Sequence, residues 1–156
     1  MYQITEIKDQ EEKRRICEEI LRTLPNWFGI EEAIIDYRNS VMDMPFIAVL
    51  DKNKFIGFIA IKIHNQYTAE VYVMGITEDY HRKGIGKLLI NECESYCIDK
   101  GYEFLTVKTL DESRECESYS KTRLFYLSMG FKPLEVFSSL WGEDNPCLFM
   151  AKALNK

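Results

Sequence analysis

The chain has 156 residues, of which 46% are hydrophobic and 29% are charged, and these values predict one globular domain spanning residues 1–156. Twenty Lys and Arg residues against 25 Asp and Glu residues give a formal net charge of −5, which argues against a basic surface for nucleic acid. No apolar run approaches the roughly 18 residues of a membrane span, and the N-terminal segment is rich in charge. We therefore expect a cytoplasmic protein without a membrane or nucleic-acid partner.

The five cysteines follow no recognisable disulfide or metal-binding pattern. They are odd in number, and none belongs to a C-x-x-C sequence. Cys93 and Cys97 lie four residues apart in a predicted helix, where two small buried side chains fit better than a redox pair. Because the chain also has only two histidines, the sequence predicts no bound metal.

The hydrophobic pattern predicts an α/β fold with the element order βααβββαβαββ. The first half is expected to form a strand at 2–7, helices from Asp9 to near Leu24 and at 31–42, and strands at 46–50, 55–64 and 68–76. The second half is expected to form a helix at 84–98, a strand at 104–109, a helix at 118–129, and strands at 132–137 and 148–154. Hairpins come first and helices alternate with strands later, so we expect a mixed, mostly antiparallel central sheet flanked by helices.

A glycine-rich turn, His81-Arg82-Lys83-Gly84-Ile85-Gly86-Lys87, joins a predicted strand to a predicted helix. At such a junction, free backbone N–H groups and the helix dipole can hold a phosphate. A dinucleotide-binding G-x-G-x-x-G is excluded by Leu89, and a P-loop is excluded by His81 and Leu88. The basic side chains and two glycines favour anion binding over the alternative, a purely structural tight turn.

At its two glycines this turn resembles the (Gln/Arg)-x-x-Gly-x-(Gly/Ala) signature of the GNAT family of acetyl-CoA-dependent N-acetyltransferases, with His81 in place of Gln or Arg. Phe125-Tyr126-Leu127-Ser128-Met129-Gly130-Phe131 is similar to a second landmark of that family, F-Y-x-x-x-G-F. The resemblance implies a GNAT-like fold and acetyl-CoA as the acetyl-donor cosubstrate. The residues it assigns to acetyl-CoA are Met74, Ile76, His81, Arg82, Lys83, Gly84, Ile85, Gly86 and Lys87, the first two acting through their backbone groups.

Glu70 is a candidate general base, because it is the only carboxylate in the predicted strand 68–76. Strict alternation places Ala69, Val71, Val73 and Gly75 on one face of this strand and Thr68, Glu70, Tyr72, Met74 and Ile76 on the other. The pair Ala69-Glu70 is similar to the place where histone-acetylating members of the family carry their catalytic glutamate. A structural ion pair is the alternative role for this side chain.

Tyr126 is the candidate general acid. A phenol keeps its proton at neutral pH and can therefore donate it to a departing thiolate. Spacing alone favours a packing role for a tyrosine on an amphipathic helix, and it is the match to F-Y-x-x-x-G-F that implies the acid role.

The acceptor site is predicted from aromatic residues. The resemblance implies that Trp27, Phe28 and Trp141 contribute to it, since the loop between the first two helices often lines this site in the family. We expect transfer of acetyl from acetyl-CoA to a primary amine of a small molecule or peptide by direct attack. The alternatives are a non-catalytic acyl-CoA-binding or sensing module and a protein N-terminal or lysine acetyltransferase. The oligomeric state is open, with a homodimer as one alternative.

Overall fold

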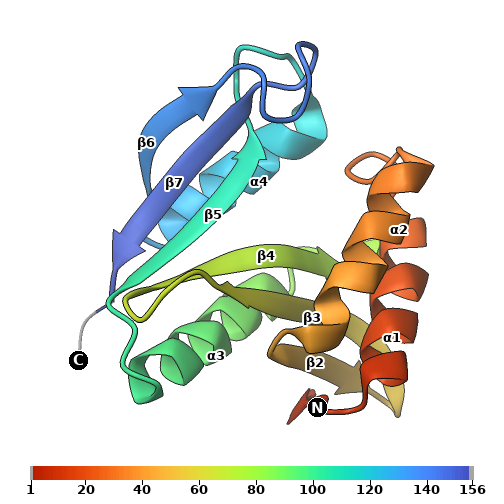
Figure 1. Ribbon diagram of the computed structural model, residues 1–156. Helices are drawn as coiled ribbons and strands as arrows, with labels where there is room; N and C mark the ends of the chain where they lie inside the picture. The colour runs from red at the N-terminus through yellow and green to blue at the C-terminus, as the bar shows by residue number, and fades with distance from the viewer. Residues whose placement is uncertain (1, 155–156) are drawn as a thin grey trace.

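The computed structural model describes residues 2–154 (Figure 1). The strands are β1 (Gln3–Glu6), β2 (Phe46–Asp51), β3 (Lys54–Ile63), β4 (Thr68–Ile76), β5 (Phe104–Leu110), β6 (Lys132–Phe137) and β7 (Cys147–Ala153). The helices are α1 (Gln10–Arg22), α2 (Glu31–Ser40), α3 (Ile85–Asp99) and α4 (Glu117–Ser128), with single 3-10 turns η1 (Val41–Asp43) and η2 (Glu78–Tyr80). The predicted element order is confirmed. The second helix is two residues shorter than expected, because its last turn tightens into η1.

The seven strands form one sheet in the order β1-β2-β3-β4-β5-β7-β6. All neighbouring strands are antiparallel except β4 and β5, which are parallel. The expected mixed, mostly antiparallel sheet is therefore confirmed. Among residues 2–154, no helix is both long and apolar enough to span a membrane.

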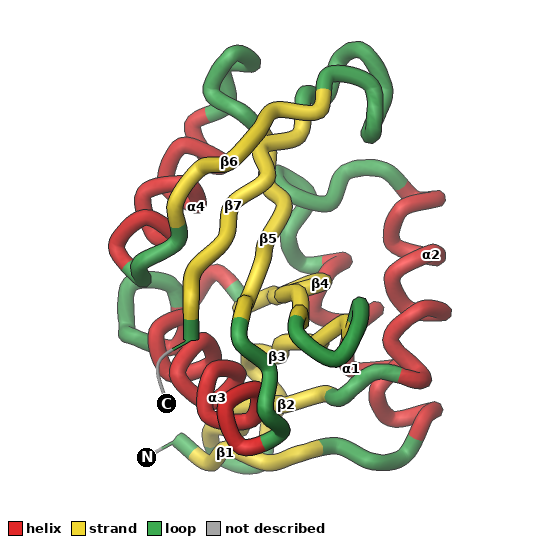
Figure 2. The backbone as a smooth tube through the Cα atoms, turned by 60° about the vertical axis from the view of Figure 1, so that its left-hand side comes forward, coloured by secondary structure: helices red, strands yellow, loops and turns green. Residues whose placement is uncertain are grey.

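Helices cover both faces of the sheet and enclose two hydrophobic cores. The first core packs α1 and α2 on one face, around buried residues such as Ile16, Leu21 and Phe58. The second packs α3 and α4 on the opposite face, around residues such as Leu89 and Val107. Figure 2 shows α2 and α4 on opposite sides of the strands. Asp9 begins α1 as predicted, since its side chain accepts a hydrogen bond from the Glu12 backbone at 2.9 Å.

β4 contains a bulge that corrects the expected assignment of its faces. Ala60 of β3 pairs with Val73 and Ile61 pairs with Val71, so Tyr72 is an extra residue in β4. The face toward α3 holds Ala69 and Val71 before the bulge and Met74 and Ile76 after it. The face toward α1 and α2 holds Tyr72, Val73 and Gly75. Strict alternation is therefore wrong beyond Val71, because one inserted residue reverses the side-chain pattern. Glu70 does not share a face with Met74 and Ile76.

β4 and β5 separate halfway along their length. They pair only from Thr68 with Phe104 to Val71 with Val107, and β5 continues instead along β7. Figure 1 shows β5, β6 and β7 turning away from β2, β3 and β4, so that the second half of β4 runs without β5 beside it. The part of β4 after Val71 therefore has a strand partner on one side only, and its backbone groups on the other side can bind a ligand.

Candidate active site

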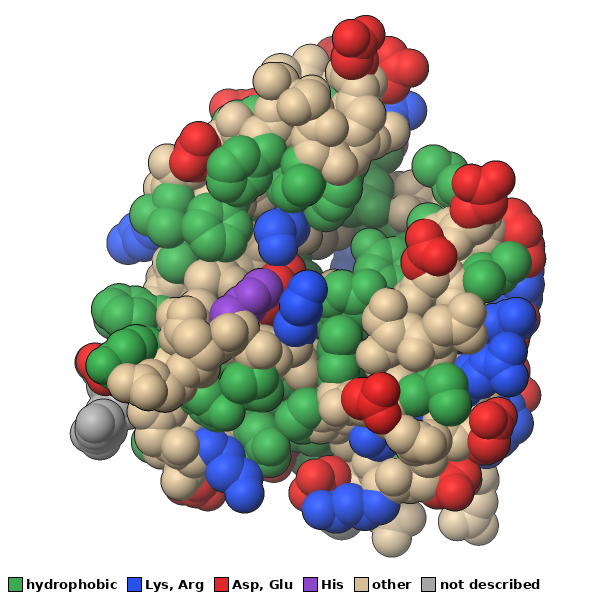
Figure 3. Space-filling model, viewed as in Figure 1, with side chains coloured by type: hydrophobic (Ala, Val, Ile, Leu, Met, Phe, Trp, Pro, Cys, Tyr) green, Lys and Arg blue, Asp and Glu red, His purple; other side chains and the backbone are tan. Residues whose placement is uncertain are grey.

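A cavity of about 1010 Å³ lies in the opening between β4 and β5. Its walls are the second half of β4, the glycine-rich turn, the loop after α1, and the α4 helix. Figure 3 shows the molecule hollowed between the strands β5–β7 and helix α2, with hydrophobic side chains in the hollow. The cavity is large enough for an extended small molecule, since typical ligand sites measure roughly 300–1,000 Å³.

The glycine-rich turn forms one end of this cavity and opens onto the N-terminus of α3. Gly84 precedes the helix with φ +82°, and a Cβ atom at this position would meet nothing within 4 Å. The first turn of α3 carries no acidic residue and no side-chain cap, so its first backbone N–H groups remain available to an anion. All the residues that the resemblance assigns to acetyl-CoA line the cavity except Lys83, whose ammonium lies 5.2 Å from the centre of the Tyr80 ring.

His81 connects the turn to β4 and to the loop after α1. Its Nε2 donates a hydrogen bond to the backbone carbonyl of Ile76 at 2.6 Å. The imidazole ring also meets the Trp27 ring edge-on, with 5.4 Å between the ring centres. This histidine thus fixes the end of β4 against the turn. One backbone group of Ile76 is already engaged by the protein itself.

Two tyrosines of α4 lie at the wall of the cavity. Tyr126 is buried, and burial raises the pKa of its phenol, so that it stays protonated at neutral pH. Burial also raises the pKa of Tyr119 to about 12. The Tyr119 hydroxyl donates to the backbone carbonyl of Trp27 at 2.7 Å. The hydroxyl of Tyr119 therefore holds the loop after α1 in place. Tyr126 is the tyrosine that the sequence predicts as general acid.

Thr109 of β5 is a cavity residue that sequence reasoning missed. Its side chain is 2% exposed, it lines the large cavity, and its hydroxyl has no hydrogen-bond partner among the described residues. A buried hydroxyl without a partner is costly, so this group is available to a polar atom of a ligand. A threonine in a strand gives no such signal in the sequence, because it equally fits an ordinary buried position.

Glu70 lies on the other face of the sheet in a cluster of charged side chains. It is only 3% exposed. Lys108 of β5 donates to both carboxylate oxygens at 3.1 and 3.0 Å, and His64 Nε2 lies 2.6 Å from Oε1. The ion pair considered from the sequence is therefore present, and its partners, His64 and Lys108, were not predicted.

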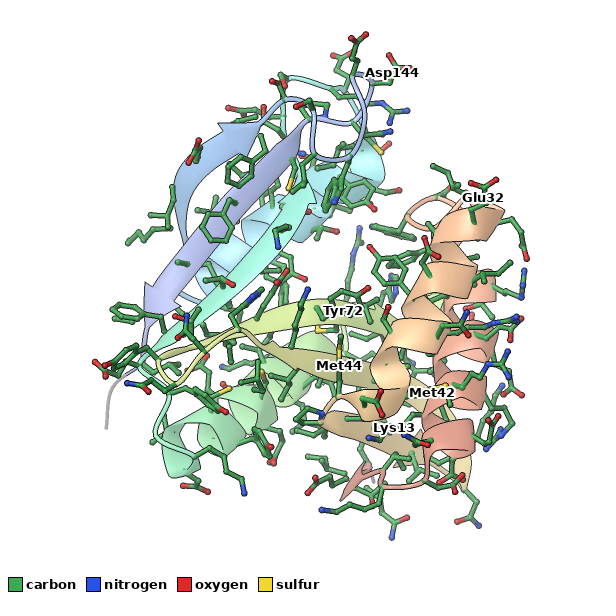
Figure 4. The ribbon with its side chains drawn as sticks, in the orientation of Figure 1. Lys13, Glu32, Met42, Met44, Tyr72 and Asp144 are labelled. Carbon is green, nitrogen blue, oxygen red and sulfur yellow. The ribbon has the colours of Figure 1, made fainter. Side chains whose placement is uncertain are left out.

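A second cavity, of about 330 Å³, begins at Glu70 and extends toward α2. Four residues line both this cavity and the large one: Tyr37, Tyr72, Lys108 and Trp141. In Figure 4, Tyr72 lies between β4 and α2, while Glu32 and Asp144 lie at opposite rims of the opening. The two cavities thus approach each other through the gap between β4 and β5.

The aromatic residues expected at the acceptor site, Trp27, Phe28 and Trp141, all line the large cavity. The Trp27 indole N–H donates to Thr122 Oγ1 at 3.1 Å, which attaches the loop after α1 to α4. Trp141, in the loop between β6 and β7, is 37% exposed. It is the member of the three that lines both cavities.

Cys17 and Cys147 are poor nucleophiles, and the side chains of residues 2–154 form no metal-binding group. All five cysteines are free thiols. Burial raises the pKa of Cys17 to about 12 and that of Cys147 to about 11, so neither is a ready nucleophile at neutral pH. Within residues 2–154, no three His, Cys, Asp or Glu side chains are grouped so as to hold a metal ion.

The chain is similar in sequence to known acetyltransferases. Residues 12–131 match the model of the Acetyltransferase (GNAT) family. The uncharacterized N-acetyltransferase CT2212 of Chlorobaculum tepidum is 29% identical over 84 residues, covering 54% of this chain and 47% of that relative. The chain therefore spans about half the length of this relative.

Two solved structures show the same fold. An aminoglycoside 6'-N-acetyltransferase complexed with coenzyme A is similar with a TM-score of 0.78 and 19% identity, covering 99% of this chain and 98% of that chain. The ribosomal-protein-S18-alanine N-acetyltransferase of Escherichia coli is similar with a TM-score of 0.79 and 14% identity, covering 100% of this chain and 96% of that chain. At these identities the likeness concerns the fold.

Proposed function

Because the chain belongs to the GNAT family of acetyltransferases, we propose that residues 1–156 act as one domain that transfers acetyl from acetyl-CoA to a primary amine by direct attack. The observation that carries this proposal is the gap between β4 and β5, where the large cavity takes lining residues from both sides of the sheet and the second cavity adjoins it on the α2 side. A donor and an acceptor that enter from opposite sides would meet there without a covalent enzyme intermediate.

The residues around the large cavity fit acetyl-CoA as cosubstrate. The open space beside Gly84 and the uncapped first turn of α3 suit a pyrophosphate, with Arg82 and Lys87 adding positive charge. The unpaired side of β4 near Met74 offers backbone groups to the pantetheine arm and the acetyl carbonyl. Thr109 supplies a further hydrogen-bonding group, because its hydroxyl is buried without a partner among the described residues.

The proposed roles of the two proton carriers follow from their opposite positions. Tyr126, on the α4 side, is protonated at neutral pH because burial raises its pKa. We propose that it donates this proton to the departing thiolate through its position, since a raised pKa makes the phenol a weaker acid. Glu70, on the α2 side, accepts a proton from the incoming ammonium, directly or through water. The bulge at Tyr72 matters here, because it lets the strand present Glu70 to one face and Met74 to the other.

The acceptor is proposed to be a small-molecule or peptide amine that enters beside α2. Trp141 and Tyr37 offer aromatic surface to a cation, and Glu32 and Asp144 place negative charge at the rims of the opening (Figure 4). The names of the two similar structures show that one such fold acts on an aminoglycoside and another on a ribosomal protein. Both acceptor classes therefore belong in the test.

The test combines binding and turnover. We expect calorimetry to show acetyl-CoA binding in the range of roughly 1 μM to 1 mM typical of enzyme substrates. We expect thiol release in the presence of at least one member of a panel of simple amines, polyamines, aminoglycosides and peptides. Tight binding without thiol release from any amine would favour the non-catalytic acyl-CoA-binding alternative. Absence of binding would contradict the proposal.

A further inference from the structure

We propose that His64 carries away the proton that Glu70 removes from the acceptor amine. This inference rests on the proposed function and adds to it the route by which the base is restored. His64 follows β3, and its Nε2 lies 2.6 Å from Glu70 Oε1, which is within hydrogen-bonding distance for direct proton transfer. It acts through Glu70 and does not touch the substrate, since it lines neither of the two cavities.

Burial makes such a route necessary. The Glu70 side chain is 4% exposed, so bulk water has little direct access to its carboxylate. The His64 side chain is 34% exposed, and it therefore joins the buried carboxylate to the solvent. A base that is cut off from solvent by the bound acceptor must lose its proton by another path before the next turnover.

The other charged groups around Glu70 do not provide this path. Lys108 donates to both carboxylate oxygens, but an ammonium already carries its full set of protons and has no acceptor site. Lys62, which pairs with Glu70 across β3 and β4, is likewise a cation. Asp36 and Tyr37 of α2 line the second cavity, where the acceptor is proposed to bind. Imidazole is the group that both accepts and releases a proton near neutral pH.

The steps balance without any further reactant. An N–H bond of the substrate ammonium breaks and an O–H bond forms on Glu70. Beside the ionised Glu70 carboxylate, His64 carries its proton on Nε2 and donates it to Oε1. Once Glu70 is protonated, the ring exchanges through water to the tautomer with its proton on Nδ1, so that Nε2 can accept. The Glu70 O–H bond then breaks as an N–H bond forms at Nε2, which leaves a carboxylate beside an imidazolium, and release of the Nδ1 proton to water restores the starting pair.

The test compares two substitutions of His64 with one of Lys108. In His64→Gln the side-chain amide keeps an N–H donor for Glu70 but cannot pass a proton. We expect its kcat to fall by roughly 10²-fold, the lower end of the effect of a positioned proton carrier, with the KM for acetyl-CoA unchanged. Thermal melting verifies that each variant is folded.

Imidazole in the buffer separates a relay from a structural role. We expect it to restore the kcat of His64→Ala in proportion to its concentration, because it can occupy the vacated position and carry the proton. The matched control, Lys108→Gln, loses the other donor to Glu70 and should gain nothing from imidazole. Full activity of His64→Gln, or equal effects of imidazole on all variants, would overturn the relay while leaving the proposed function intact. Wild-type protein that releases no thiol with any amine would overturn both.

Discussion

The two sides of the opening between β4 and β5 are built in different ways. On the α3 and α4 side, one continuous segment from Met74 to Lys87 supplies much of the cavity wall, beside the buried neutral phenol of Tyr126. On the α2 side, Glu70 meets Lys108 and His64, charged and titratable groups drawn from separate segments. The first side therefore depends on local backbone conformation, and the second depends on long-range side-chain contacts.

The largest effect is expected on the α3 and α4 side of the opening, at Tyr126. Tyr126→Phe removes one hydroxyl and keeps the ring that packs against Phe131 at 5.5 Å between ring centres. We expect kcat to fall by roughly 10²- to 10⁴-fold, as for loss of a general acid, with little change in acetyl-CoA affinity by calorimetry. A fully active Tyr126→Phe protein would return this residue to a packing role.

The charged side should respond differently, in a manner that depends on pH. Glu70→Gln keeps the shape of the side chain and removes its ability to take a proton from the ammonium. We expect a loss of about 10²-fold at low pH, where the acceptor amine is mostly charged, and a smaller loss as pH approaches the amine's own pKa. The pH profile of kcat is the measurement. A profile that matches wild type would leave Glu70 with only its ion pair to Lys108.

Substitutions of two glycines separate acetyl-CoA binding at the glycine-rich turn from the strain of a left-handed backbone. Gly84 and Gly101 lie at opposite ends of α3 with φ +82° and φ +89°, and a Cβ at either would meet nothing within 4 Å. Gly84→Ala and Gly101→Ala should each cost roughly 1–2 kcal/mol of unfolding free energy, the cost of a left-handed alanine. Only Gly84→Ala should raise the KM for acetyl-CoA, by about tenfold, which equals about 1.4 kcal/mol. Equal KM values in the two variants would contradict pyrophosphate binding at this turn.

The smallest effect concerns stability at alkaline pH. The folded-state pKa of Tyr126 is raised above its usual value of 10.0 by burial, so above that pH the unfolded chain releases a proton that the folded chain retains. The contribution of Tyr126 to the free energy of unfolding is therefore fully present below pH 10 and is lost as pH rises further. Urea unfolding at pH 8 and pH 11 should show a smaller loss for Tyr126→Phe than for wild type. An identical loss would indicate that Tyr126 is accessible to water.

The sequence predicted the fold more completely than the site, for a physical reason. The limits of β4 and β6 were obtained from hydrophobic pattern and turn residues, which act locally. The bulge at Tyr72 was missed because residues 71–76 are apolar or aromatic on both faces, so a shift of one position leaves no trace in the pattern.

The same distinction applies to the site residues. His81 to Lys87 form a contiguous motif, and the sequence could therefore indicate an anion site there. Lys108 and His64 have no motif of their own, because their importance arises from the partner, Glu70, that only the folded chain brings to them. Thr109 has none either, because only the fold shows that its hydroxyl is buried beside the cavity without a partner among the described residues. The aromatic residues proposed for the acceptor side, which the resemblance pointed to, all line the large cavity.

The central claim is that the two sides serve one direct transfer, and initial-rate kinetics test it most directly. With acetyl-CoA and an active amine both varied, the account predicts intersecting double-reciprocal lines, because donor and acceptor must be bound together. Intact-protein mass spectrometry after mixing with acetyl-CoA alone should show no acetyl adduct on any of the five cysteines. Parallel lines together with a kinetically competent acetylated protein would contradict direct attack across the gap between β4 and β5.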